Sequence, residues 1–183
     1  MTPNELIRRY TIVLDIDYRS GKPTPTGKLY ISGGALAKEN GDWEKIASAK
    51  EEIKAILLKE FEEEQRTSQE REAKINAIPG LKEIKAAKED LENWHHEWED
   101  SFRDVGGMGV RPKPQYDFEE LYRKYPRASA YLKAEAYSRA ANYAKASAGK
   151  KALERVINGE DCDTVLPEME AEWSAYCDEH IWD

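Results

Sequence analysis

A long stretch with helical periodicity, residues 42–102, constrains the fold of this chain more than any other feature. Its apolar residues recur at intervals of three and four, with Lys and Glu between them. This spacing is typical of helices with one buried face. Pro79 and Gly80 interrupt the stretch, so we expect one helix over residues 42–76, capped by Asp42, and a second from residue 81. The tight turn between them predicts an antiparallel helical hairpin.

The second of these helices carries a seam in which Ile84, Leu91 and Trp98 are one heptad apart. Trp94 lies on the same seam, and two tryptophans are bulkier than a two-helix coiled coil usually buries. We therefore expect a third element or a second subunit to cover Trp94 and Trp98, as part of the core or of a self-association surface. A homodimer is one prediction from this seam.

The N-terminal region predicts a β-hairpin. Residues 12–18 alternate apolar and polar side chains with β-branched residues among them, which is typical of a strand with one buried face. A loop rich in Gly and Pro follows at residues 20–27, and residues 28–32 read as a second strand. The predicted class is α+β, predominantly α-helical, with a small N-terminal β-hairpin, a long antiparallel helical hairpin and C-terminal helices.

Glycines 106, 107 and 109, followed by Arg-Pro-Lys-Pro, form the clearest linker signal. We expect the two hairpins within residues 1–105, a linker at residues 106–115 and a helical region over residues 116–183, with both regions able to pack as one unit. The C-terminal region predicts a short helix (117–124), a long Ala-rich helix (127–157) and a last helix (166–181). Thr164 is the expected cap of the last helix, and Pro167 falls in its first turn.

Charge is segregated along the chain, whose net charge is −8. Residues 111–157 hold eleven Lys and Arg against five acids. Basic side chains interleaved with Tyr can bind phosphate and stack on bases, although they also suit a helix with a Tyr and Ala core face. The acidic net charge favours packing over nucleic-acid binding. The candidate nucleic-acid contacts are Arg123, Lys124, Arg127, Lys133, Arg139 and Lys145.

Residues 158–183 hold nine acids and no Lys or Arg. One interpretation is that this acidic segment neutralises the basic helix within the molecule. The other is that it imitates the phosphates of nucleic acid and competes for a partner's basic groove. The candidate partner-binding residues are Glu168, Glu170, Glu172, Asp178 and Glu179.

The sequence carries no convincing catalytic set, so we expect no enzyme. Asp15 and Asp17 fit a solvent-facing pair on the hairpin better than a phosphatase site, because no phosphate-binding turn follows them. The gap between Cys162 and Cys177 does not match a zinc knuckle, and only Cys177 and His180 have a suitable helical spacing, so we expect two free thiols, no metal and no cofactor. Neither a membrane span nor a secretory signal is visible, which predicts a cytoplasmic protein.

The C-terminal segments YRKYPRASAYLKAEAYSRAANYAKASAGKKALERVINGED and EMEAEWSAYCDEHIWD resemble small proteins from phages and mobile elements of gut Firmicutes. In its small size, acidic charge and lack of catalytic motifs, the chain is similar to type II-A anti-CRISPR proteins. That family shares no common motif, so the resemblance transfers no functional residue. It implies a stoichiometric inhibitor that binds a type II CRISPR effector nuclease of the bacterial host, with or without its guide RNA, and blocks DNA loading or cleavage. The alternatives are a nucleic-acid-binding accessory or repressor protein and a self-associating scaffold.

Overall fold

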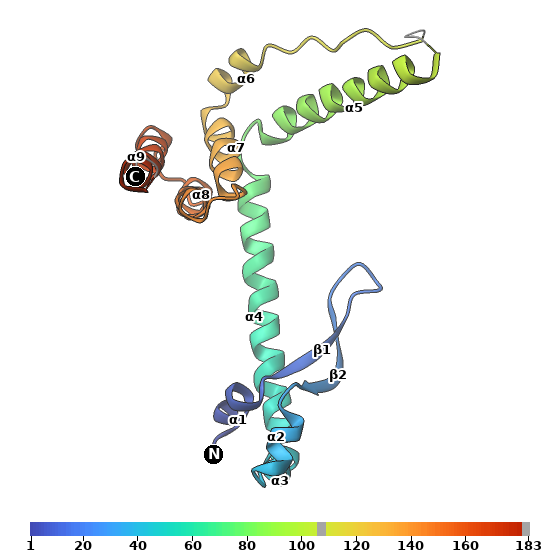
Figure 1. The fold of residues 1–183 in the computed structure, drawn as a ribbon, viewed down its shortest axis with the longest axis vertical. Coiled ribbons are helices and arrows are strands. Elements are labelled where there is room, and N and C mark those ends of the chain that lie inside the picture. Colours follow the sequence, from blue (N-terminus) through green and yellow to red (C-terminus); the bar gives the residue numbers. More distant parts are fainter. Residues whose placement is uncertain (106–108, 181–183) are drawn as a thin grey trace. The chain divides into compact units, whose positions relative to one another are not determined.

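The computed structural model of the chain describes residues 1–105 and 109–180. The fold is α+β and predominantly helical, as predicted, with nine helices and one antiparallel pair of strands among these residues (Figure 1). The strands are β1 (Ile12–Asp17) and β2 (Thr24–Ile31). The helices are α1 (Pro3–Tyr10), α2 (Gly34–Glu39), α3 (Trp43–Ser48), α4 (Lys50–Asn76), α5 (Leu81–Val105), α6 (Phe118–Lys124), α7 (Pro126–Ser138), α8 (Tyr143–Ile157) and α9 (Cys162–His180).

The chain forms two compact units, Met1–Glu70 and Arg71–Asp183, called here the N-terminal unit and the C-terminal unit. Their boundary lies within α4, whereas the sequence predicted a division at residues 106–115. Part of that predicted linker, residues 106–108, lies outside the described residues. The helix that precedes it, α5, belongs to the C-terminal unit.

The first turns of α5 explain this placement. Leu81 and Ile84 are buried in one cluster with Tyr131 of α7. The predicted heptad seam therefore does not form one buried face in this unit, because Leu91 is only half-buried and Trp98 is exposed. The antiparallel packing of α5 on α4 stays a prediction.

The predicted β-hairpin is confirmed, and its second strand is longer than expected. β2 begins at Thr24, which pairs with Asp17, so part of the predicted loop belongs to the sheet. The register shifts between Leu14 and Ile16. At this irregularity the Thr26 hydroxyl donates a hydrogen bond to the Asp15 carboxylate at 2.7 Å. Asp15 therefore has a local structural contact on the hairpin.

Helix α1 was not predicted, although its signal is in the sequence. Thr2 and Glu5 form a capping box, in which each side chain accepts a hydrogen bond from the other residue's backbone N–H. The helix buries Leu6 and Tyr10 against Ile12 of β1. These side chains supply the hairpin with the apolar packing that a two-stranded sheet needs.

Asp42 has a different role from the predicted helix cap. It precedes α3, but its side chain makes no capping hydrogen bond, and the expected helix over residues 42–76 is divided at Ala49 into α3 and α4. The carboxylate is buried and accepts hydrogen bonds from the Tyr10 hydroxyl and the Lys45 ammonium, both at 2.6 Å. The hydrogen bond from Lys45, and to a smaller extent that from Tyr10, lowers the pKa of Asp42. Asp42 thus ties α1 to α3 with a buried charge that has partners.

The long helix predicted over residues 127–157 is wrong, because the chain turns at residues 139–142 to give α7 and α8. The Asn142 side chain caps α8 by accepting hydrogen bonds from the backbone N–H groups of Ala144 and Lys145 in the first turn of that helix. The two helices pack very closely at Gly149, where a Cβ would lie 2.3 Å from the backbone nitrogen of Ser138. The turn allows two Ala-rich faces to bury each other, which a single straight helix cannot do.

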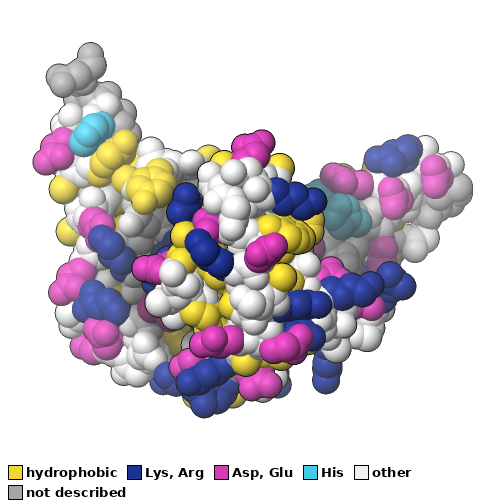
Figure 2. Space-filling view, turned by 90° about the horizontal axis from the view of Figure 1, so that it is seen from below, with side chains coloured by type: hydrophobic (Ala, Val, Ile, Leu, Met, Phe, Trp, Pro, Cys, Tyr) yellow, Lys and Arg dark blue, Asp and Glu magenta, His cyan; other side chains and the backbone are white. Residues whose placement is uncertain are grey.

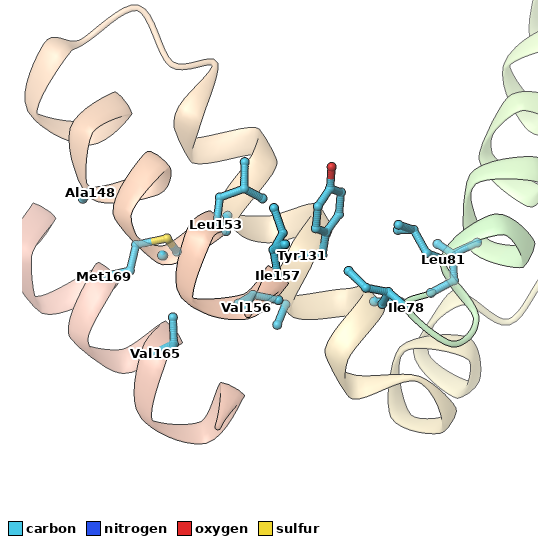
Figure 3. Close-up of a cluster of buried hydrophobic side chains, with 14 residues drawn as sticks. Ile78, Leu81, Tyr131, Ala148, Leu153, Val156, Ile157, Val165 and Met169 are labelled. Atoms are coloured by element: carbon cyan, nitrogen blue, oxygen red, sulfur yellow. The ribbon is translucent and has the colours of Figure 1, made fainter. Parts of the chain in front are cut away.

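The last helix begins earlier than predicted, at Cys162, so Thr164 lies inside α9 and is not its cap. Figure 3 shows Val165 and Met169 of α9 directed toward α8, where they are buried with Leu153 and Val156. The core of the C-terminal unit therefore joins α7, α8 and α9 with the first turns of α5.

Candidate interaction surfaces

An aromatic ladder lies on the C-terminal half of α5. Trp94, Trp98 and Phe102 follow one another by one helical turn, with ring centroids 6.4 Å apart for the first pair and 4.5 Å for the second. Trp94 is half-buried, but Trp98 is 38% and Phe102 54% exposed. Neighbouring exposed aromatic rings are typical of interaction surfaces. The ladder is the most apolar exposed feature of this helix.

An extended segment, residues 110–116, lies along α5 and is called here the strap (Figure 1). The indole N–H of Trp94 donates a hydrogen bond to the carbonyl oxygen of Arg111 at 2.7 Å. Lys113 lies over the Trp94 ring, with its ammonium 5.8 Å from the centroid. The strap therefore covers Trp94, whereas Trp98 is exposed, so cover of both tryptophans by a third element or a second subunit stays a prediction.

Ion pairs hold the strap in place. The Arg111 guanidinium lies 2.9 Å from the Asp90 carboxylate and 3.0 Å from that of Glu97. The Tyr116 hydroxyl donates a hydrogen bond to Asp90, and loss of solvent together with this bond raises the pKa of Tyr116. Each of these contacts is exposed at the surface, so salt will weaken the strap's attachment.

The ladder is bordered by carboxylates. Residues 89–104 carry seven acids and one arginine. Asp90, Glu97 and Asp104 recur every seven residues, which places them along one edge of the helix. On the other side of the ladder, His95 and Glu99 lie 3.4 Å apart. This half of α5 thus combines exposed aromatic rings with a negative border. The heptad spacing of the three acids is a signal in the sequence from which this border could have been predicted.

The predicted acidic face on α9 is largely engaged within the C-terminal unit. Glu168 lies 2.6 Å from Arg155, Glu172 lies 2.6 Å from Lys151, and Glu170 pairs with Lys133. The remaining two candidates, Asp178 and Glu179, lie exposed near the end of the helix. These ion pairs agree with the interpretation that the acidic segment neutralises the basic one. On the face of the molecule drawn in Figure 2, acidic and basic side chains are also interspersed.

The candidate nucleic-acid contacts have neighbours too. Arg127 donates hydrogen bonds to the carbonyls of Val156 and Ile157, and Arg139 lies 2.9 Å from Glu135. Lys145 lies over the rings of Tyr137 and Trp173, and Lys124 lies over that of Tyr125. Arg123 is exposed, and Lys133 is the partner of Glu170. Binding of nucleic acid by these residues stays a prediction.

The N-terminal unit has an open groove of about 420 Å³ between β2 and α3. Leu29, Ile31, Trp43, Ile46 and Ala47 line its apolar part, and Trp43 is 40% exposed. Unlike the ladder on α5, this groove has no acidic residue in its lining, and its charged lining residues are Lys28 and Lys50.

The cysteines and histidines do not converge. Cys162 and Cys177 are free thiols, and burial raises the pKa of Cys162. Within residues 1–105 and 109–180, no three His, Cys, Asp or Glu side chains are grouped to hold a metal ion.

Comparisons of the chain with protein-family models, with curated proteins and with solved structures find no match. Over the described part of the chain, every helix is too short or too polar to cross a membrane. The candidate surfaces therefore stand on their own geometry.

Proposed function

We propose that the protein is a non-catalytic binding protein whose C-terminal half of α5 docks on a basic surface of a partner protein. The observation that carries this proposal is the exposed pair Trp98 and Phe102 beside a row of carboxylates. Aromatic side chains supply much of the binding energy in protein interfaces, and peripheral charges steer the correct partner and exclude others. On the other acidic helix, α9, three of the six acids are paired with basic side chains of α7 and α8, and these three are less available.

A second copy of the chain is a poorer occupant of the ladder. Two α5 helices packed face to face would bring their acidic borders together, and only Arg103 among residues 89–104 offers an opposite charge. Like charges across an interface oppose association. The predicted homodimer thus becomes one outcome of the tests below.

The resemblance to type II-A anti-CRISPR proteins supplies the proposed partner, a type II CRISPR effector nuclease in the bacterial cytoplasm. Such nucleases hold guide and target in positively charged channels. An acidic helix with an aromatic ladder suits docking beside or within such a channel, which would block DNA loading or cleavage without chemistry. This partner also explains why the net charge of the inhibitor is negative.

The test is a titration of the purified protein into a type II-A nuclease cleavage assay, with and without guide RNA, together with direct binding to the nuclease. We expect inhibition that saturates near one chain per nuclease and is lost for Trp98→Ala and Phe102→Ala. Trp173→Ala, a tryptophan on α9, is the matched control and should inhibit like the unaltered protein.

A mobility shift on naked DNA and RNA completes the experiment. Absence of inhibition, with a salt-dependent shift that Arg123→Ala and Lys124→Ala weaken, would replace the proposal with the nucleic-acid-binding alternative. Absence of both inhibition and a shift would reject both functions.

A further inference from the structure

The strap shows what kind of group this half of α5 binds. Its guanidinium at Arg111 lies between two carboxylates of the heptad row, Asp90 and Glu97. Its backbone passes the edge of Trp94 and accepts the indole hydrogen bond. Pro112 and Pro114 keep the strap extended and remove two backbone donors, so side-chain charge dominates its attachment. The strap is thus an internal basic ligand of an acidic, aromatic helix.

The same arrangement of acceptors continues along α5 beyond the strap. Glu97 and Asp104 have the heptad spacing of Asp90 and Glu97. Trp98 and Phe102 lie beside this second interval, and both rings are exposed. Carboxylates and aromatic ring faces both attract cations, most strongly the planar guanidinium. Arg111 of this chain fills the first interval and also pairs with Glu97. The second interval therefore offers another molecule the Asp104 carboxylate, a share of Glu97 and the two exposed rings.

We propose that the partner presents an extended segment bearing Arg or Lys, and that one of its basic side chains binds between Glu97 and Asp104 against Trp98 and Phe102. This inference rests on the proposed function and specifies the chemistry that the α5 surface recognises. The segment extends the line of the strap and repeats its mode of contact. An acidic segment lacks the charge that the interval selects.

The experiment uses the full-length protein and the peptide VRPKPQY, which is the sequence of residues 110–116, as the probe. Binding is followed by the indole N–H signals in NMR spectra, with the Trp98 signal assigned from its loss in Trp98→Phe. We expect the peptide to shift the Trp98 signal, and the effect to weaken with salt. The control peptide carries Arg111→Gln and Lys113→Gln and should leave this signal in place.

Asp104→Asn should weaken peptide binding by about threefold, the size expected for one exposed ion pair. Among the described residues, the contacts that hold the strap involve Asp90, Trp94 and Glu97 and not Asp104, so Asp104→Asn keeps them. Glu92→Gln is the matched control. Glu92 precedes Trp94 by two residues, and residues two apart on a helix point about 200° apart, so Glu92 lies away from the ladder. Equal shifts by both peptides, or a shift at Trp94 alone through replacement of the strap, would overturn the inference.

The outcomes separate this inference from the proposed function. Loss of nuclease binding by Trp98→Ala with no peptide shift at Trp98 would keep the function and reject the basic segment. A peptide shift that depends on Asp104, with nuclease binding insensitive to Trp98→Ala, would keep basic recognition and reject that partner. A concentration-dependent dimer that Trp98→Ala abolishes, measured by sedimentation, would assign the ladder to a second copy and overturn the inference.

Discussion

Two acidic helices of the C-terminal unit, α5 and α9, use their carboxylates in different ways. On α9, Glu168, Glu170 and Glu172 each pair with a basic side chain of α7 or α8. On α5, only the first two acids of the heptad row pair with the strap, and the aromatic rings beside the row's last acid are exposed. The available charge of a helix therefore depends on its neighbours as well as on its composition.

The two helices also differ in how they are anchored. Val165 and Met169 fix α9 in the core, whereas no described residue of α5 after Ala87 is buried. Burial in the core gives a helix its stability, and surface ion pairs add little. We infer that α9 stabilises the fold of the C-terminal unit and that the C-terminal end of α5 is available to bind a partner.

The largest expected effect is that of Met169→Ala. Met169 is only 2% exposed, so truncation leaves a cavity and should lower the free energy of unfolding by about 2 to 4 kcal/mol. Denaturant unfolding measures this change. Partner binding at a temperature where the variant is folded should be unaffected, and reduced binding there would contradict the scaffold role of α9.

Trp98→Ala should do the opposite. Because the ring is exposed, we expect the unfolding midpoint to change little and the affinity for the partner to fall by at least about tenfold. Calorimetric titration alongside thermal unfolding separates the two quantities. A large drop in stability with unaltered affinity would make Trp98 a core residue and remove the contrast with Met169.

Neutralising the α9 acids with Glu168→Gln, Glu170→Gln and Glu172→Gln together should have a smaller effect. The three ion pairs are exposed, so we expect the free energy of unfolding to fall by about 1 kcal/mol, and by less at high salt. Affinity for the partner should stay the same. A clear loss of affinity would return these residues to the binding surface that the sequence predicted.

Arg111→Ala should have the smallest effect on stability, less than about 1 kcal/mol, because both of its carboxylate partners are exposed. Its effect is local: the strap loses its ion pairs, so the indole N–H signal of Trp94 should shift in NMR spectra. The signal of Trp173 serves as the internal control. An unchanged Trp94 signal would show that the backbone hydrogen bond alone holds the strap.

The sequence predicted the fold class and the β-hairpin correctly because both depend on local patterns. Alternation over residues 12–18 and helical periodicity from residue 42 onward are short-range signals. The division of residues 127–157 into α7 and α8 was missed, because an Ala-rich segment has high helix propensity throughout and tertiary packing at Gly149 decides where it turns. Helix α1 was missed although its capping box was present.

The candidate site was harder to predict. Trp94 and Trp98 were recognised as a seam, but which of them is covered depends on the strap folding back on α5. The pairing of Glu168 with Arg155 and of Glu170 with Lys133 depends on the packing of α9 against α8 and α7. Composition gives the sign of the net charge of each segment, whereas the ion-pair partners of its residues depend on the fold.

The two hydrogen bonds from Arg127 to the last carbonyls of α8 couple the start of α7 to the end of α8. The end of α8 cannot fray without releasing Arg127, and the first turn of α7 cannot detach without exposing those carbonyls. Amide hydrogens near Ala130 and Ile157 should therefore exchange with solvent in one shared opening event. We therefore expect α7 and α8 to open as one cooperative unit, and α9 packs against this unit through Val165 and Met169.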